Sequence, residues 1–116
     1  MEARKIRMNF INKVRIPEIV RDLDKLAKEL IDYLKDFESE KNRAHQKIGQ
    51  AKAILESTLP KLRSVDKENI VEFINDAKGI SLVSFDKDEG WAMSTKLSGI
   101  VAFLQQRAKD SKWDNV

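Results

Sequence analysis

The chain has 116 residues, the length of one domain with room for a buried core. Charged residues make up 35% of it, above the ~25% of an average globular protein, which is typical of helices with solvated outer faces. The absence of cysteine excludes disulfides, thiolate zinc sites and thiol nucleophiles. No secretory signal and no membrane span are expected, because no stretch approaches the ~18 consecutive apolar residues that a span requires. We therefore expect a cytoplasmic protein.

Residues 1–16 form a basic segment. Its five basic residues against Glu2 give a net charge of +4, and they are Arg4, Lys5, Arg7, Lys13 and Arg15. Apolar and polar residues in 5–16 alternate in a way that fits a strand better than a helix, although Ile6, Phe10 and Val14 align in the helical reading. Pro17 suits the first turn of a helix. We predict a basic N-terminal arm or strand that ends at a boundary between residues 16 and 17.

The stretch 17–59 carries the clearest amphipathic pattern, because its apolar residues recur at steps of three and four. The pattern lapses between Glu38 and Arg43, a segment without any hydrophobic residue, glycine or proline. One continuous helix, about 60 Å long at 1.5 Å per residue, is the favoured interpretation. A helical hairpin broken near residues 39–42 is the alternative. In either case the helix should end before Pro60.

A continuous helix of that length exceeds the diameter of a 116-residue globule, so its apolar side would need a partner. The sequence therefore predicts a homo-oligomer, a homodimer above all, in which the long helices complete one another's cores as in a bundle or coiled coil. The residues expected to form this assembly seam are Leu23, Leu30, Phe37, Ile48 and Leu55.

The second half of the chain predicts shorter elements. A helix is expected over 66–78, with Asp66 as N-cap and Gly79 as the stop. The alternating, β-branched run that follows predicts a β-hairpin or an ordered loop over 80–94. Ser94 is expected to cap a last helix over 94–110, followed by a tail at 111–116. The expected fold is a single, mainly α domain, in which a long helix packs with two shorter ones and a small β element pairs the hairpin with an N-terminal strand.

Catalytic and metal motifs are absent from the sequence. His45, the single histidine, has no flanking motif, and the acidic run at 86–90 lacks the spacing of a calcium loop. Neither GxGxxG nor GxxxxGK[ST] occurs, so no loop is built to cradle phosphate. We expect no cofactor, no metal and no enzymatic activity.

The remaining signal is an uneven distribution of charge. Residues 64–93 hold seven acidic and three basic side chains, a net charge of −4, opposite to that of residues 1–16. Such asymmetry steers a charged partner or reflects pairing within the fold. We predict a non-enzymatic protein–protein interaction module that self-associates through its long helix. The alternative is a small nucleic-acid-binding protein that uses the basic residues of 1–16.

Overall fold

The computed structural model describes the backbone of residues 2–62 and 64–113 and the side chains of 16–62 and 67–109. Helices make up nearly all of this backbone: α1 (Glu2–Lys35), α2 (Phe37–Thr58), the 3₁₀ turn η1 (Leu59–Lys61), α3 (Ser64–Lys78) and α4 (Lys87–Trp113). The mainly helical fold predicted from the sequence is confirmed. The predicted β element is not, since the described backbone contains no strand.

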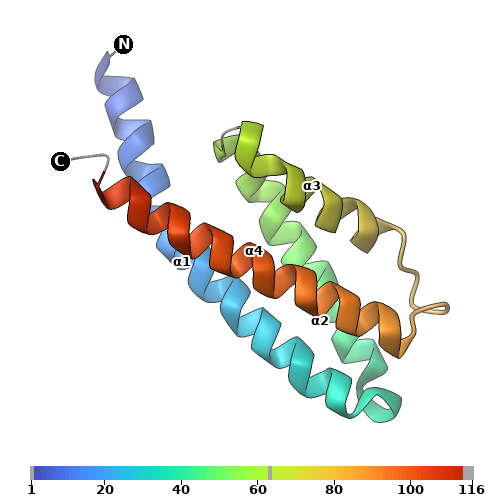
Figure 1. Cartoon of the computed structure of the whole chain (residues 1–116). Coiled ribbons are helices and arrows are strands. Elements are labelled where there is room, and N and C mark those ends of the chain that lie inside the picture. The colour runs from blue at the N-terminus through green and yellow to red at the C-terminus, as the bar shows by residue number, and fades with distance from the viewer. Residues whose placement is uncertain (1, 63, 114–116) are drawn as a thin grey trace.

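The four helices pack as an elongated bundle of 53 × 22 × 19 Å (Figure 1). α1 lies against both α2 and α4, and α3 packs on α2 and α4. α4 runs antiparallel to α1, because Leu34 meets Gly90 near one end and Pro17 and Ala108 line a common groove near the other. The turn between α1 and α2 and the connection between α3 and α4 meet at one end, which we call the loop end.

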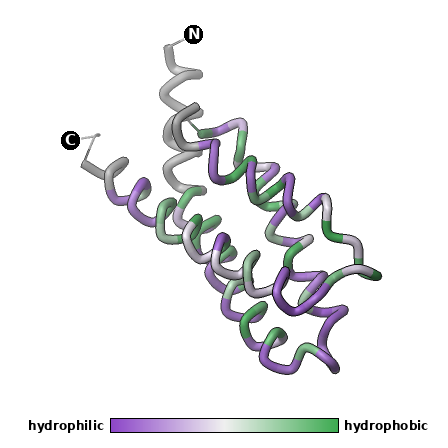
Figure 2. The backbone as a smooth tube through the Cα atoms, turned by 45° about the vertical axis from the view of Figure 1, so that its right-hand side comes forward, coloured by the Kyte–Doolittle hydropathy of each residue, from purple (hydrophilic) through white to green (hydrophobic). Residues whose placement is uncertain are grey.

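All four helices contribute apolar side chains to one core. Hydrophobic and hydrophilic residues alternate along each helix in short blocks (Figure 2), so every helix has an apolar stripe to bury. Burying one large apolar side chain stabilises the fold by about 1.5–3 kcal/mol. The large apolar side chains that are most completely buried are Leu23, Leu30, Leu34, Leu55, Ile70, Phe73, Leu97 and Leu104. Within the described residues, no helix is both long enough and apolar enough to cross a membrane.

The stretch predicted as one long helix is a helical hairpin. The helix breaks at Asp36, where φ is −124° and ψ is 52°, and the carbonyl of Asp36 accepts hydrogen bonds from the N–H groups of Ser39 (3.2 Å) and Glu40 (2.9 Å). The continuous reading is therefore wrong and the hairpin alternative is right. The break precedes the polar 38–43 stretch, although Glu40 marks a kink there with φ −115° and ψ 17°. Folding back lets the two apolar faces bury each other, which a straight helix in a single chain prevents.

The strand predicted within 5–16 and the boundary at 16/17 are both wrong. α1 begins at Glu2 and continues through Pro17, which lies inside the helix. Extending an existing helix costs less free energy than nucleating a new element. The Lys, Arg and Met residues of this segment also favour helix. A strand here would in addition have no partner strand in the described backbone.

The β-hairpin predicted over 80–94 is also wrong, whereas the loop given as its alternative is present over residues 80–86. Residues 80–86 form an irregular connection, and α4 begins at Lys87, so Ser94 is buried inside the helix instead of capping it. The helix predicted over 66–78 is confirmed, but it begins at Ser64, so Asp66 lies inside the helix and is not its N-cap as predicted. It stops as expected at Gly79, whose N–H donates to the carbonyls of Asn75 and Asp76 at 3.3 and 3.1 Å. α2 ends at Thr58, before Pro60.

Candidate interaction surface

The connection between α3 and α4 is anchored to the bundle by Phe85. This ring is only 2% exposed and lies 5.4 Å, centroid to centroid, from Phe37 at the start of α2. The His45 ring meets the edge of the same aromatic at 5.6 Å. Such tilted aromatic pairs add about 0.5–1.5 kcal/mol beyond the area they bury. Phe85 therefore fixes the connection to the first turns of α2.

Hydrogen bonds hold the backbone on both sides of this anchor. The Nε2 of His45 lies 3.0 Å from the carbonyl oxygen of Ile80 and donates to it, which ties the start of the connection to α2. At the other side, the N–H of Asp86 donates to Oε1 of Glu89 (3.1 Å), and the N–H of Glu89 donates to Oδ1 of Asp86 (2.7 Å). This reciprocal pair is a capping box, which satisfies N–H groups that the first turn of a helix leaves free.

Two apolar side chains stand in solvent at the centre of the connection. Val83 is 93% exposed and Leu82 is 41% exposed, and we call these two residues the tip. The hydroxyls of Ser81 and Ser84 lie 2.7 Å apart, and the N–H of Ser84 donates to Oγ of Ser81 at 3.2 Å, so the tip sits in a closed turn. Leu82 and Val83 are neighbours in the chain, so their exposed surfaces form one small apolar patch on an ordered turn.

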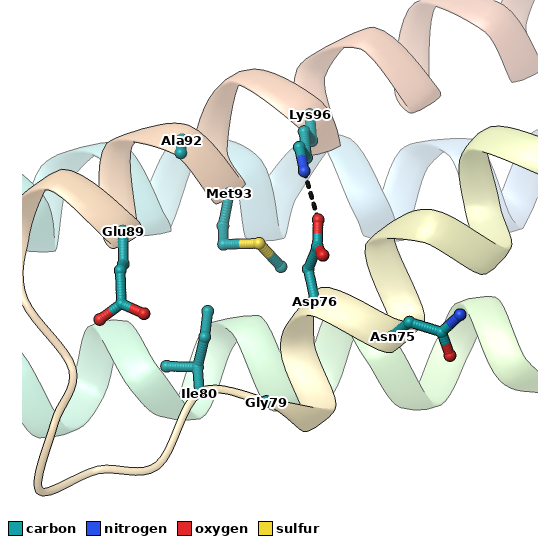
Figure 3. A pocket seen from close by; sticks show the side chains of 8 residues that line it. All are labelled: Asn75, Asp76, Gly79, Ile80, Glu89, Ala92, Met93 and Lys96. Atoms are coloured by element: carbon teal, nitrogen blue, oxygen red, sulfur yellow. Dashed lines mark hydrogen bonds and ion pairs between the residues drawn. The ribbon is translucent and has the colours of Figure 1, made fainter.

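A groove of about 380 Å³ lies between the end of α3 and the start of α4 (Figure 3), and its lining includes Ile80, two residues before the tip. Met93 from α4 and Ile80 from the connection point toward one another across it and form its apolar part. Carboxylates of Asp76 and Glu89 flank these two side chains. The groove is open to solvent, and its full lining is Asn75, Asp76, Gly79, Ile80, Glu89, Ala92, Met93 and Lys96.

Lys96 bridges α3 and α4 at the far side of the groove. Its Nζ donates to Asp76 Oδ2 and lies 3.3 Å from Glu72 Oε1. The hydrogen bond to Asp76, followed by the one to Glu72, raises the pKa of Lys96 above its ordinary value of 10.5. Lys96 therefore forms ion pairs with two carboxylates. Because one cation faces two anions, the surface around it stays acidic.

The residues predicted to form an assembly seam lie mainly in the chain's own core. Leu23, Leu30, Ile48 and Leu55 are buried between the helices of a single chain, and Phe37 is half-buried against Phe85. The structure thus brings the first four together as predicted for one apolar face. The partner that covers this face is the rest of the same chain, because the hairpin folds back at residue 36.

The predicted basic residues belong to the first part of α1. Arg4, Lys5, Arg7, Lys13 and Arg15 fall outside the side chains that the structure describes, so their proposed role stays a prediction. Among the described residues no group of three or more His, Asp or Glu side chains is arranged to hold a metal ion.

Sequence reasoning missed the tip, the Phe85 anchor and the capping box. The alternation of 80–85 predicts a β-hairpin or an ordered loop, and the acidic run after it a turn, but neither prediction identifies these three features. A usable signal was present, since Asp86 and Glu89 have the three-residue spacing of a capping box just before Trp91. No comparable signal marks Leu82 and Val83 as exposed, because their exposure depends on where Phe85 is buried.

Comparison with known proteins provides no relative: no family model matches the chain, and no curated protein and no solved structure is similar to it.

Proposed function

We propose that this protein is a non-enzymatic protein–protein interaction module that binds through the tip and the neighbouring groove. The single observation that carries the proposal is the exposure of Val83 on a connection pinned at Phe85, Ile80 and the capping box. Covering an exposed valine stabilises a complex by up to about 1.5–3 kcal/mol. The turn is already ordered in the free chain, so binding does not have to order it.

This surface replaces the seam as the proposed site of assembly. The argument for a seam depended on a straight helix that could not bury its own apolar face, and the hairpin at Asp36 removes that argument. Association through Leu23 or Leu55 would require the bundle to open, at the cost of the free energy of their burial. The tip is available without any such change. Self-association is therefore retained as a proposal, with a different contact surface.

The absence of cysteine makes a site-specific test straightforward. A photoreactive maleimide on Val83→Cys should cross-link to protein, either to a second copy in the purified chain or to another protein in an extract of the source cells. Ala102→Cys, on an exposed position of α4, is the matched control. Adducts at residue 83 should exceed those at 102 and should disappear with excess unlabelled wild type but persist with excess Val83→Asp. Equal cross-linking at the two positions, in both the purified chain and the extract, would overturn the proposal.

A further inference from the structure

The two most highly charged parts of the chain have opposite signs and come from different elements: residues 2–16 belong to the start of α1, and residues 64–93 comprise α3, the connection and the first turns of α4. Residues 1–16 sum to +4 (five basic, one acidic) and residues 64–93 sum to −4 (three basic, seven acidic). The acidic region includes both walls of the groove. Among the described side chains, no cation lies within 4.0 Å of the carboxylates of Asp86, Asp88 or Glu89. These carboxylates are thus available to a basic partner at low energetic cost.

The basic segment cannot reach the groove of its own chain. Pro17 lines a groove together with Ala108 and Lys109, which lie near the C-terminal end of α4. The tip, in contrast, comes just before the N-terminal end of the same helix. Lys87 and Lys109 are 22 positions apart in α4, which corresponds to about 33 Å of helix. α1 runs from Leu34 at the loop end to Pro17 and continues in helix to Glu2. Residues 2–16 therefore lead away from the groove, and only another molecule can bring a basic segment to it.

We propose that the occupant of the tip and groove is the basic segment 1–16 of a second copy of this chain, so that molecules associate head to tail. This inference rests on the proposed function and names the partner of the same surface. The segment combines five basic residues with Ile6, Phe10 and Val14, spaced four residues apart within α1. An amphipathic helix with that spacing docks by placing its apolar residues on an apolar groove. Here the apolar contact is the tip with the half-buried Ile80, and the cations meet the surrounding carboxylates.

Head-to-tail contact has consequences that a two-fold dimer lacks. Because the two contacting surfaces differ, the assembly closes into a ring or continues as an open chain, and in both cases it increases with concentration. Opposite charges on an exposed surface attract over about 10 Å at 0.1 M salt and over about 3 Å at 1 M. Association should therefore weaken as salt is added, whereas purely apolar contact through the tip should not.

Two charge-reversed full-length variants provide the decisive test. The first carries Arg4→Glu, Lys5→Glu and Arg7→Glu, and the second carries Glu72→Lys and Asp88→Lys, beside the groove but outside the capping box. Sedimentation velocity should show wild type growing beyond its 13.4 kDa mass with concentration at low salt. Each variant alone should associate at least tenfold more weakly. An equimolar mixture should associate again, because the intact basic segment of one variant can then meet the intact acidic groove of the other.

The control variant Glu18→Lys with Asp22→Lys makes the same change in net charge as the groove variant, but on exposed positions of α1, and should associate as wild type does. Circular dichroism should show unchanged helix content for every variant. The inference is overturned if reversed variants associate like wild type, if their mixture stays monomeric, or if wild type is monomeric at every concentration. In each of these cases cross-linking at residue 83 still decides the proposed function, because it also detects a different protein partner.

Discussion

Gly90 and Leu34 pack so closely that the first turn of α4 has no room for a side chain at position 90. A β-carbon there would overlap Cδ2 of the fully buried Leu34 and would lie 3.2 Å from Cζ of Phe85. The absence of a side chain at Gly90 thus lets α1, α4 and the anchored connection meet at the loop end.

Gly90→Ala should destabilise the fold. Overpacking a filled core costs about 1–3 kcal/mol, and the better helix propensity of alanine returns at most about 1 kcal/mol. Urea denaturation should therefore show a net loss of about 1 kcal/mol. Gly99→Ala is the matched control in the same helix: nothing lies within 4 Å of its added β-carbon, so it should gain about 0.5–1 kcal/mol. Equal stability of the two variants would contradict the close packing at Gly90.

Phe85→Ala should both destabilise the bundle and free the tip. Truncating a buried phenylalanine costs about 3–5 kcal/mol, and this ring also holds the connection to Phe37 and His45. Hydrogen exchange of the amides of 80–86 should accelerate beyond the global loss of stability. Val83→Ala, at an exposed position two residues earlier, should stay within about 0.5 kcal/mol of wild type. Unchanged exchange in Phe85→Ala would show that the ring is not the anchor.

The Lys96 bridge should stabilise the fold at neutral pH and lose this effect at alkaline pH. The hydrogen bonds to Asp76 and then Glu72 raise the pKa of Lys96 above 10.5. A raised pKa in the folded state contributes stability that is complete below the unfolded value and is lost as pH rises through the folded value. The groups are exposed, so the contribution is small, about 0–1 kcal/mol.

Unfolding free energies of wild type and Lys96→Met should therefore differ by less than about 1 kcal/mol at pH 7 and converge well above the ordinary lysine pKa. The difference should also shrink in 1 M salt. Lys25→Met is a suitable control, since Lys25 is exposed and has no ion pair among the described side chains. A difference that grows with pH would reverse the assigned sign.

The nucleic-acid alternative predicts a different use of residues 1–16. If these basic residues bind phosphate, the chain should be retained on DNA or RNA columns at low salt and released as salt rises. Changing Arg4, Lys5 and Arg7 to Glu should abolish retention, and the groove variant Glu72→Lys with Asp88→Lys should not reduce it. Retention that depends neither on the salt concentration nor on the substitutions at Arg4, Lys5 and Arg7 would eliminate this alternative.

The periodicity of the sequence was enough to identify most of the helices and much of the core. Leu23, Leu30, Ile48 and Leu55 were selected by spacing alone, and all four are buried. This works because the 3.6-residue period of an apolar stripe is a local property, present before any tertiary contact forms. The same argument placed the helix ending at Lys78 and its stop at Gly79.

Periodicity does not indicate whether two successive helical segments continue in one direction or fold back on each other. A straight helix and a hairpin at Asp36 share the same apolar stripe, and only the gain from burying one half against the other selects the hairpin. The alternation in 80–85 was likewise compatible with a strand or a loop, and the burial of Phe85 between α1, α2 and α4 selects the loop. The exposed tip follows from that burial. Local spacing therefore determined which apolar residues share one face of a helix. Long-range packing determined which apolar residues are buried and which remain in contact with water.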